Sequence, residues 1–167
     1  MKYSRFEDLP VWQAAIEFAL KVFEFTGRAE SLFRGFGDTK NQLERAALSI
    51  SNNIAEGFER GTTAELINFL YIARGSSGES RSMLCLCERL PRFKDFKSEI
   101  EHLKLRAENV SRQLHGWIES LKNSEIKGVK FLTEKELRKI QQIKEDKEFQ
   151  ELPQKVTRGE KIDWDKI

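Results

Sequence analysis

Apolar residues recur every three or four positions along residues 100–121. They are Ile100, Leu103, Ala107, Val110, Leu114, Trp117 and Leu121. Alternating spacings of three and four place these side chains on one stripe of an α-helix, and a stripe with a period near 3.5 residues is a heptad seam. Such a seam packs nearly parallel to the helices beside it. The segment therefore favours a bundle of helices over any other fold.

Three earlier segments show a similar periodicity and predict three more helices. They span about residues 9–25, 39–59 and 63–90. A glycine-rich stretch and the RGTTAEL turn separate them, and a threonine with Glu65 close behind it is typical of a helix start. No strand pattern competes. Four helices with short connections are most simply arranged as an antiparallel up-down-up-down four-helix bundle, so we expect an all-α domain over residues 1–122.

Residues 123–167 differ in character and are expected to form a charged C-terminal extension. A capping-box spacing predicts a short helix near residues 134–147, with a thin apolar face and dense charge. We interpret the extension as an appendage that packs on the bundle or on a partner, although disorder in isolation is an equal alternative. Its partner-binding residues would be Leu137, Ile140 and Trp164.

The composition limits where the protein can act. No apolar run approaches the roughly 18 residues that a membrane span needs. The first ten residues, MKYSRFEDLP, lack the apolar region of a signal peptide. We therefore expect a cytoplasmic protein without a membrane partner. The formal net charge is only +2, so any contact with nucleic acid has to come from a local basic patch.

No set of residues converges on a catalytic or metal site. On a helix, Cys85 and Cys87 point about 200° apart, and His102 and His115 about 220° apart. Neither pair can share a metal ion on its own helix. The motifs of zinc peptidases, phosphate loops, serine hydrolases and cysteine–histidine enzymes are missing from the chain. We therefore expect no enzyme activity, no metal, no cofactor and no small-molecule substrate.

Small residues occupy the middle of the third predicted helix. The segment GSSGES, residues 75–80, shares a broad face with larger apolar residues, which would let a neighbouring helix approach closely. On the shoulder of this face, Arg74, Arg81 and Glu88 stand seven positions apart and form one charged line. These side chains either lie beside the core and form salt bridges, or make a stripe that meets phosphates or another subunit.

The second predicted helix contains the stretch SISNNIAEG, with three poor helix formers. A helical wheel turns Asn53 and Gly57 toward the core and Asn52 away from it. We expect Asn53 to find a buried hydrogen-bond partner and to fix the helix register. We expect Gly57 to allow a close crossing or to cap the helix. A second face, formed by Leu48, Ser51 and Ala55, suggests contact with another chain and hence an oligomer.

Three motifs give the chain a family resemblance. They are VWQAA at residues 11–15, QLERAALSISNNIAEG at residues 42–57 and NFLYIARGSSGE at residues 68–79. With these motifs the chain resembles the four-helix-bundle proteins named for the intervening sequence of 23S ribosomal RNA, also called the S23 family. The resemblance covers roughly residues 6–122. Relatives of the family include the accessory variability determinant of diversity-generating retroelements.

The resemblance implies an antiparallel four-helix bundle that assembles into a homo-oligomeric ring, commonly a pentamer. In the retroelement branch such a ring binds a reverse transcriptase and nucleic acid and has no catalytic activity of its own. The function expected here is that of a bacterial, non-enzymatic accessory protein that binds structured RNA or a nucleic-acid enzyme. The candidate RNA contacts are Arg45, Arg60, Arg74 and Arg81. The alternative is a protein-binding scaffold that uses its C-terminal tail and does not touch nucleic acid.

Overall fold

The computed structural model describes residues 3–123 and residue 142. The chain divides into two units, residues 1–130 and residues 131–167. Among the described residues, the first unit consists of four α-helices: α1 (Pro10–Arg28), α2 (Thr39–Glu59), α3 (Thr63–Arg89) and α4 (Lys97–Lys122). Short 3₁₀ helices accompany them: η1 (Phe6–Asp8), η2 (Glu30–Phe33) and η3 (Pro91–Phe96). The predicted all-α four-helix bundle is confirmed.

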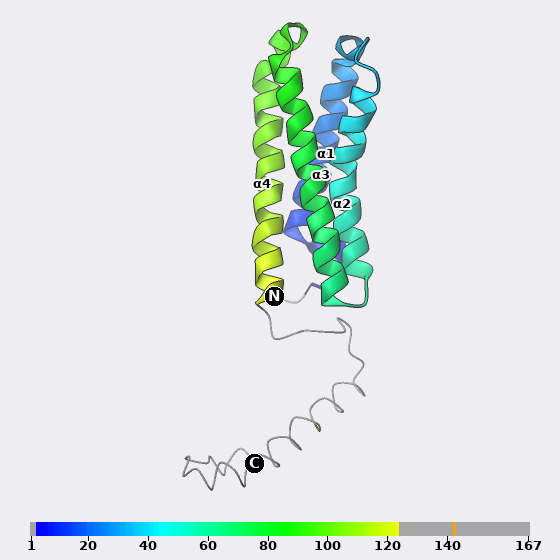
Figure 1. Ribbon diagram of the computed structural model, residues 1–167, viewed down its shortest axis with the longest axis vertical. Coiled ribbons are helices and arrows are strands. Elements are labelled where there is room, and N and C mark those ends of the chain that lie inside the picture. Colours follow the sequence, from blue (N-terminus) through cyan, green and yellow to red (C-terminus); the bar gives the residue numbers. More distant parts are fainter. Residues whose placement is uncertain (1–2, 124–141, 143–167) are drawn as a thin grey trace. The chain divides into compact units, whose positions relative to one another are not determined.

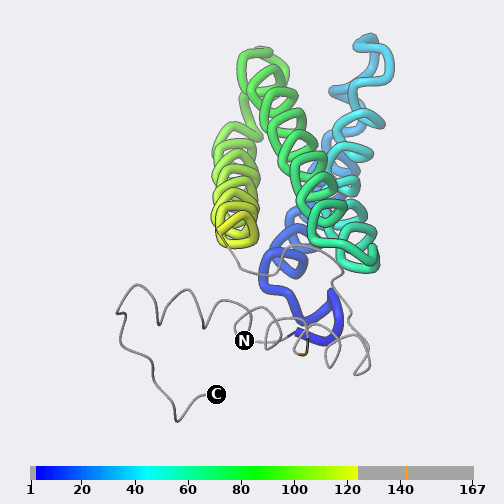
Figure 2. The backbone as a smooth tube through the Cα atoms, turned by 60° about the horizontal axis from the view of Figure 1, so that its bottom comes forward, coloured from blue at the N-terminus to red at the C-terminus, as the bar shows by residue number. Residues whose placement is uncertain are grey.

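Successive helices run in alternating directions (Figure 1). The α1–α2 and α3–α4 connections lie together at one end of the bundle, and the α2–α3 turn lies at the other. Each helix packs on the next one in sequence, and α4 also packs on α1. As a result, α1 and α3 occupy opposite corners of the bundle, an arrangement that can also be followed in the tube of Figure 2. We call the end that carries the α1–α2 and α3–α4 connections the distal end.

The helix starts follow from local chemistry. At α3 the Thr62 hydroxyl accepts a hydrogen bond from the Glu65 N–H at 3.2 Å and donates one to the Glu65 carboxylate at 2.7 Å, so the predicted threonine cap is present. Pro10 opens α1, where its missing N–H costs nothing. This helix continues through Gly27, three residues beyond its predicted end. The helix ends at Arg28, and Gly35 and Gly37, both with positive φ, lie further along the α1–α2 connection.

The core is apolar along its length and aromatic at the distal end. There Phe33 lies against Phe25 and Phe93, with ring centroids 6.1 and 5.0 Å apart. Phe96 meets Phe25 at 5.6 Å. These contacts join the α1–α2 connection to the α3–α4 connection, so the two connections form one packed layer.

The heptad seam predicted for α4 drifts. The buried residues are Ile100, Leu103, Ala107, Val110, Leu114 and Ile118. The predicted Trp117 and Leu121 are only half-buried. An α-helix has 3.6 residues per turn, so a strict seven-residue repeat rotates around it by about 20° per heptad. By the last turns the core stripe has moved to Ile118, which corrects the prediction for this end of the helix.

Small residues on α3 bring it close to both of its neighbours, as predicted. The buried Ser77 hydroxyl donates a hydrogen bond to the Ala107 carbonyl of α4 at 2.7 Å. On the α2 side, the hydroxyl oxygens of Ser76 and Ser49 lie 3.1 Å apart. Larger side chains at these positions would push the helices apart.

Candidate nucleic-acid interface

The four predicted RNA contacts do not form one surface. Arg45 lies in the second turn of α2, and Arg60 caps the other end of the same helix. Fifteen residues of α-helix separate them, which is about 22 Å. Arg74 and Arg81 lie on α3, on the side that faces α4. The structure therefore places them at three sites.

Three of these arginines already have carboxylate partners. Arg45 pairs with Asp38 at 3.4 Å, Arg60 pairs with Glu56, and Arg81 pairs with Glu108 at 3.8 Å. All three pairs are exposed, so each is weak and water competes for it. A phosphate would nevertheless have to displace a carboxylate at each site.

Arg60 and Arg74 are held in further ways. The Arg60 guanidinium lies 5.0 Å from the centre of the Phe69 ring, which fixes it against α3. Arg74 is half-buried. The pKa of Glu119 is lowered, first by a hydrogen bond from Lys122 and to a smaller degree by the charge of Arg74. Arg74 therefore sits within the charged seam between α3 and α4.

That seam explains the charged line on α3. Arg81 pairs with Glu108 of α4, and Glu88 accepts a hydrogen bond from Lys104 of α4 at 2.7 Å. The hydrogen bond from Lys104 is the main reason that the pKa of Glu88 is lowered. Of the two interpretations open at the sequence level, salt bridges beside the core account for Arg81 and Glu88.

Asn53 differs from its prediction, because it is only half-buried and does not bond across the core. Its side-chain amide donates to the Ser49 carbonyl at 2.7 Å and to the Ser49 hydroxyl at 2.9 Å, one turn earlier in α2. The helical wheel turned Asn53 toward the core, but in the structure its amide bonds to the preceding turn of its own helix. The buried polar residue of this stretch is Ser51, which donates to the Leu48 carbonyl.

Gly57 lies where α2 packs closely against α3. It is buried, and a Cβ at this position would come within 2.7 Å of Phe69 Cβ. Only glycine fits here without a shift of one helix. The predicted close crossing is therefore present, and the alternative of a helix cap is not, because α2 continues to Glu59 and its C-cap is Arg60.

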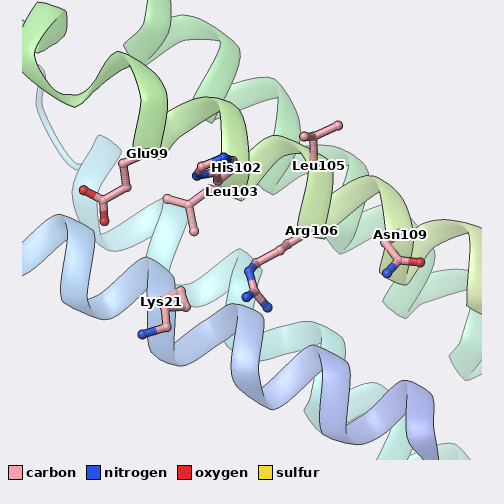
Figure 3. A pocket seen from close by; sticks show the side chains of 7 residues that line it. All are labelled: Lys21, Glu99, His102, Leu103, Leu105, Arg106 and Asn109. Atoms are coloured by element: carbon pink, nitrogen blue, oxygen red, sulfur yellow. The ribbon is translucent and has the colours of Figure 1, made fainter.

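A shallow hollow of about 610 Å³ lies between α1 and α4 (Figure 3). Its lining residues are Lys21, Glu99, His102, Leu103, Leu105, Arg106 and Asn109. The cations in and around the hollow are paired: Lys21 with Glu24 at 2.7 Å, Arg106 with Glu17 at 3.5 Å, and Arg28 with Glu99. The hollow is balanced in charge and holds no nucleophile–base pair, so its side chains do not suggest catalysis.

Large apolar side chains are exposed in two groups, and Leu105 of α4 is exposed apart from them. Leu20 and Phe23 of α1 and Leu48 of α2 form one group, and Phe23 and Leu48 line a common hollow. On α3 the exposed residues are Tyr71, Ile72 and Leu86. The second face predicted on α2 is smaller than expected, because Ser51 is buried inside the protomer and Ala55 is half-buried, which leaves Leu48 exposed.

Two glycines of α3 lie beside the second apolar group. Gly75 and Gly78 are exposed, and a Cβ on either would meet no atom within 4 Å. Glycine inside a helix costs about 1 kcal/mol relative to alanine. Packing within the protomer does not require either glycine, so the protomer alone gives no reason for this cost.

Over residues 3–123 and residue 142, no group of His, Cys, Asp and Glu side chains could hold a metal ion. Within the same residues, none of the helices is both long and apolar enough to cross a membrane.

Burial raises the pKa of the Cys87 thiol to about 11. The predicted tail residues Leu137, Ile140 and Trp164 lie outside the described part of the chain.

Comparison with known proteins decides the family. A model of the 23S rRNA-intervening sequence protein family matches residues 7–116, which include all of the first three helices and most of α4. The chain belongs to this family. The resemblance inferred from the three sequence motifs is confirmed at this level.

A solved structure from the S23 family shares the fold of this intervening-sequence protein. It is the crystal structure of a protein of unknown function from the S23 ribosomal protein family of Bacteroides thetaiotaomicron. The two superpose with a TM-score of 0.59 and 23% sequence identity, over 65% of this chain and 97% of the other. At this identity the likeness establishes the fold alone. Among curated proteins, no sequence matches the chain significantly.

Sequence reasoning missed one group of cations in this member of the 23S rRNA-intervening sequence family. Segment 89–97 reads RLPRFKDFK, with four basic residues and one acidic residue. We define the distal basic cluster as Arg89, Arg92, Lys94 and Lys97 of this segment together with Arg34 of the α1–α2 connection. All five are exposed. The density of lysine and arginine over nine residues is a signal that the sequence did contain.

Proposed function

We propose that this protein is a non-enzymatic accessory protein that assembles into a homo-oligomeric ring and binds structured RNA. The observation that carries the assembly is the pair of exposed apolar groups on different helices. Leu20 is 57% exposed on α1, and Ile72 is 52% exposed on α3. Exposed apolar groups of this kind mark interaction surfaces when they are clustered.

The positions of the two groups favour a ring over a twofold dimer. Helices α1 and α3 occupy opposite corners of the bundle, so the groups face different directions. A twofold dimer needs one self-complementary face, whereas two different faces suit head-to-tail contacts that can close into a ring. Gly75 and Gly78 would let a helix of the next subunit approach α3 closely. A pentamer is the ring size that the family resemblance implies.

Assembly is tested by molar mass in solution with matched apolar variants. We expect Leu20→Gln and Ile72→Gln each to lower the mass toward that of the protomer while the helical CD spectrum is kept. Leu105→Gln is the control, because Leu105 is 56% exposed on α4 and lies outside both groups. A wild-type protein that is a monomer at tens of micromolar would contradict the ring.

RNA binding is tested by affinity for a structured RNA as a function of salt. Contact with phosphates releases counterions, so the logarithm of the binding constant should fall linearly with the logarithm of salt concentration. A ring would repeat any basic patch of the protomer, which strengthens binding without a large net charge. A flat salt dependence, or no binding near physiological ionic strength, would rule out this part of the proposal.

We also propose that this protein is related to the accessory variability determinant of diversity-generating retroelements. If it holds, the ring should bind a reverse transcriptase as well as RNA. Co-purification with a reverse transcriptase encoded beside a template repeat would support it. Removal of residues 124–167 then tells whether the tail or the bundle makes that contact.

A further inference from the structure

The distal basic cluster differs from the predicted arginines in its ion pairing. In the described part of the chain, no carboxylate lies within 4 Å of the charged groups of Arg34, Arg89, Lys94 or Lys97. Arg92 bonds to main-chain carbonyls instead. Three of the four arginines predicted from the sequence are paired. Arg89 and Lys97 act on Glu88 at longer range, since their charges help to lower its pKa. Among the described residues, cations without a carboxylate within 4 Å are therefore concentrated in this cluster, and Arg74 of α3 and Arg112 of α4 are the others.

The structure brings the two parts of this cluster together. Arg92 donates hydrogen bonds to the carbonyl oxygens of Leu32 at 3.2 Å and Arg34 at 3.0 Å, across the two connections. Its guanidinium also lies 4.5 Å from the centre of the Phe36 ring. Arg92 thereby ties Arg34 to segment 89–97, above the aromatic layer of the distal end. These contacts fix the α1–α2 connection relative to the α3–α4 connection.

The start of α4 adds to the positive potential. The N-terminus of this helix carries a partial positive charge and has no side-chain cap from Phe96, and its first turn holds both Lys97 and the acidic Glu99, which pairs with Arg28. The N-terminus of α3 at the opposite end is capped by Thr62. There the α2–α3 turn carries Glu56, Glu59 and Glu65 around Arg60. Segment 89–97 thus carries an excess of basic residues, whereas residues 56–65 around the α2–α3 turn carry an excess of acidic ones.

We propose that the distal basic cluster is the surface that binds the phosphate backbone of structured RNA. This inference rests on the proposed function and gives the RNA contact a different place from the predicted arginines. Phosphate recognition relies on exposed cations, and the cluster presents five of them.

An acidic protein is the less suitable partner. Protein interfaces have an apolar centre with a polar rim. Among the described residues, none of the exposed large apolar side chains lies in the connections 29–38 and 90–96. Leu86 of α3, three residues before Arg89, is exposed beside the cluster. The cluster thus presents mainly charge with one apolar side chain at its edge, which suits a phosphate backbone.

The test compares two triple variants that remove the same charge. The first is Arg34→Gln/Lys94→Gln/Lys97→Gln, from the cluster. The control is Arg45→Gln/Arg60→Gln/Arg81→Gln, from the predicted and ion-paired arginines. All six residues are exposed, so both variants should fold, which their CD spectra check. Binding of a fluorescent RNA hairpin is measured by anisotropy between low and moderate salt.

The cluster variant should lose much of its affinity. Each phosphate contact contributes about 0.9 to the slope of log affinity against log salt, or about fivefold in affinity near 0.15 M salt. Three lost contacts should lower the slope by about 3 and the affinity roughly 10²-fold. The control variant should lose less than about tenfold, from the general field of the protein.

Other outcomes would overturn the inference in distinguishable ways. Equal losses in the two variants would mean that only total charge matters. A larger loss in the control would return the RNA site to the predicted arginines and leave the proposed function standing. No binding by the wild type would reject the inference together with RNA binding. Polyglutamate that competes as well as unlabelled RNA of equal charge would point to an acidic protein.

Discussion

Gly57 of α2 and Phe69 of α3 lie so close together that a Cβ on the glycine would come within 2.7 Å of Phe69 Cβ. The obstructing atom is bonded directly to the α3 backbone, so it cannot rotate away. The separation of these two helices is therefore fixed by the absence of a side chain at one position.

Gly57→Ala should destabilise the bundle although alanine is the better helix former. Overpacking costs typically 1–3 kcal/mol, and the gain in helix propensity offsets about 1 kcal/mol of it. Gly116→Ala is the control, because Gly116 is exposed in α4 and a Cβ there meets no atom within 4 Å. It should raise the free energy of unfolding by about 0.5–1 kcal/mol. Urea denaturation measures both, and effects of the same sign would contradict this account.

Substitution of Ser77 should separate the loss of a hydrogen bond from the loss of space. Ser77→Ala removes the bond to the Ala107 carbonyl and should cost about 1 kcal/mol. Ser77→Val adds a methyl group between α3 and α4 and should cost a further 1–3 kcal/mol or so. Ser82 is exposed on the same helix, and its two matching variants should stay within about 0.5 kcal/mol of wild type. Thermal melts would show whether valine is worse than alanine only at Ser77.

Asn53→Leu should leave the fold of the protomer nearly unchanged. The hydrogen bonds that it removes run to Ser49 in the same helix, and Asn53 is only half-buried. Their net loss is worth about 1 kcal/mol, and leucine recovers part of this through its higher helix propensity. A loss above about 3 kcal/mol would instead indicate a buried polar network that includes Asn53. Chemical denaturation of the variant distinguishes the two.

Cys87 should be almost inert to thiol reagents in the native state. It is buried, and its pKa is raised to about 11. At pH 8 only about one thiol in a thousand would then be ionised, and the thiolate is the reactive form. Cys85 is half-buried and should react first. The rates for Cys85→Ala and Cys87→Ala with a chromogenic disulfide test this order, and a fast reaction in Cys85→Ala would refute it.

The bond between Glu88 and Lys104 should stabilise the bundle only within a window of pH. The bond lowers the pKa of Glu88 below its usual 4.5, so its contribution is present above pH 4.5 and is lost as pH falls through the lowered value. The same bond raises the pKa of Lys104 above 10.5, so the contribution is lost as pH rises through the raised value. A double-mutant cycle with Glu88→Gln and Lys104→Met should give coupling at pH 7 and little at pH 3. Equal coupling at both would argue against it.

The sequence predicted the helices well because helix signals are local. The predicted range 39–59 is the range of α2, and the threonine cap before α3 is in place. The end of α1 was less predictable, since an isolated Gly27 looks like a stop signal although the helix continues past it. Near the end of α4 the apolar residues of the sequence follow a heptad repeat, whereas the buried residues follow the 3.6-residue turn of the helix.

The candidate site was less predictable because it depends on which charges meet across helices. Arg81 and Glu108 stand far apart in the sequence and pair only because α3 and α4 pack in one particular register. Asn53 was expected to reach across the core, and it reaches Ser49 instead. The distal basic cluster requires Arg34 to be held beside segment 89–97, a contact that no periodicity contains.

The sequence by itself determined the number of helices, their approximate ends, the apolar stripe of each and the family. These properties depend on neighbours three or four residues away, which a single chain shows directly. Only the tertiary structure decided which arginines have carboxylate partners, which glycine permits a close crossing and that Arg34 lies beside segment 89–97. Those properties depend on the distance between side chains on different helices, and that distance is set by packing.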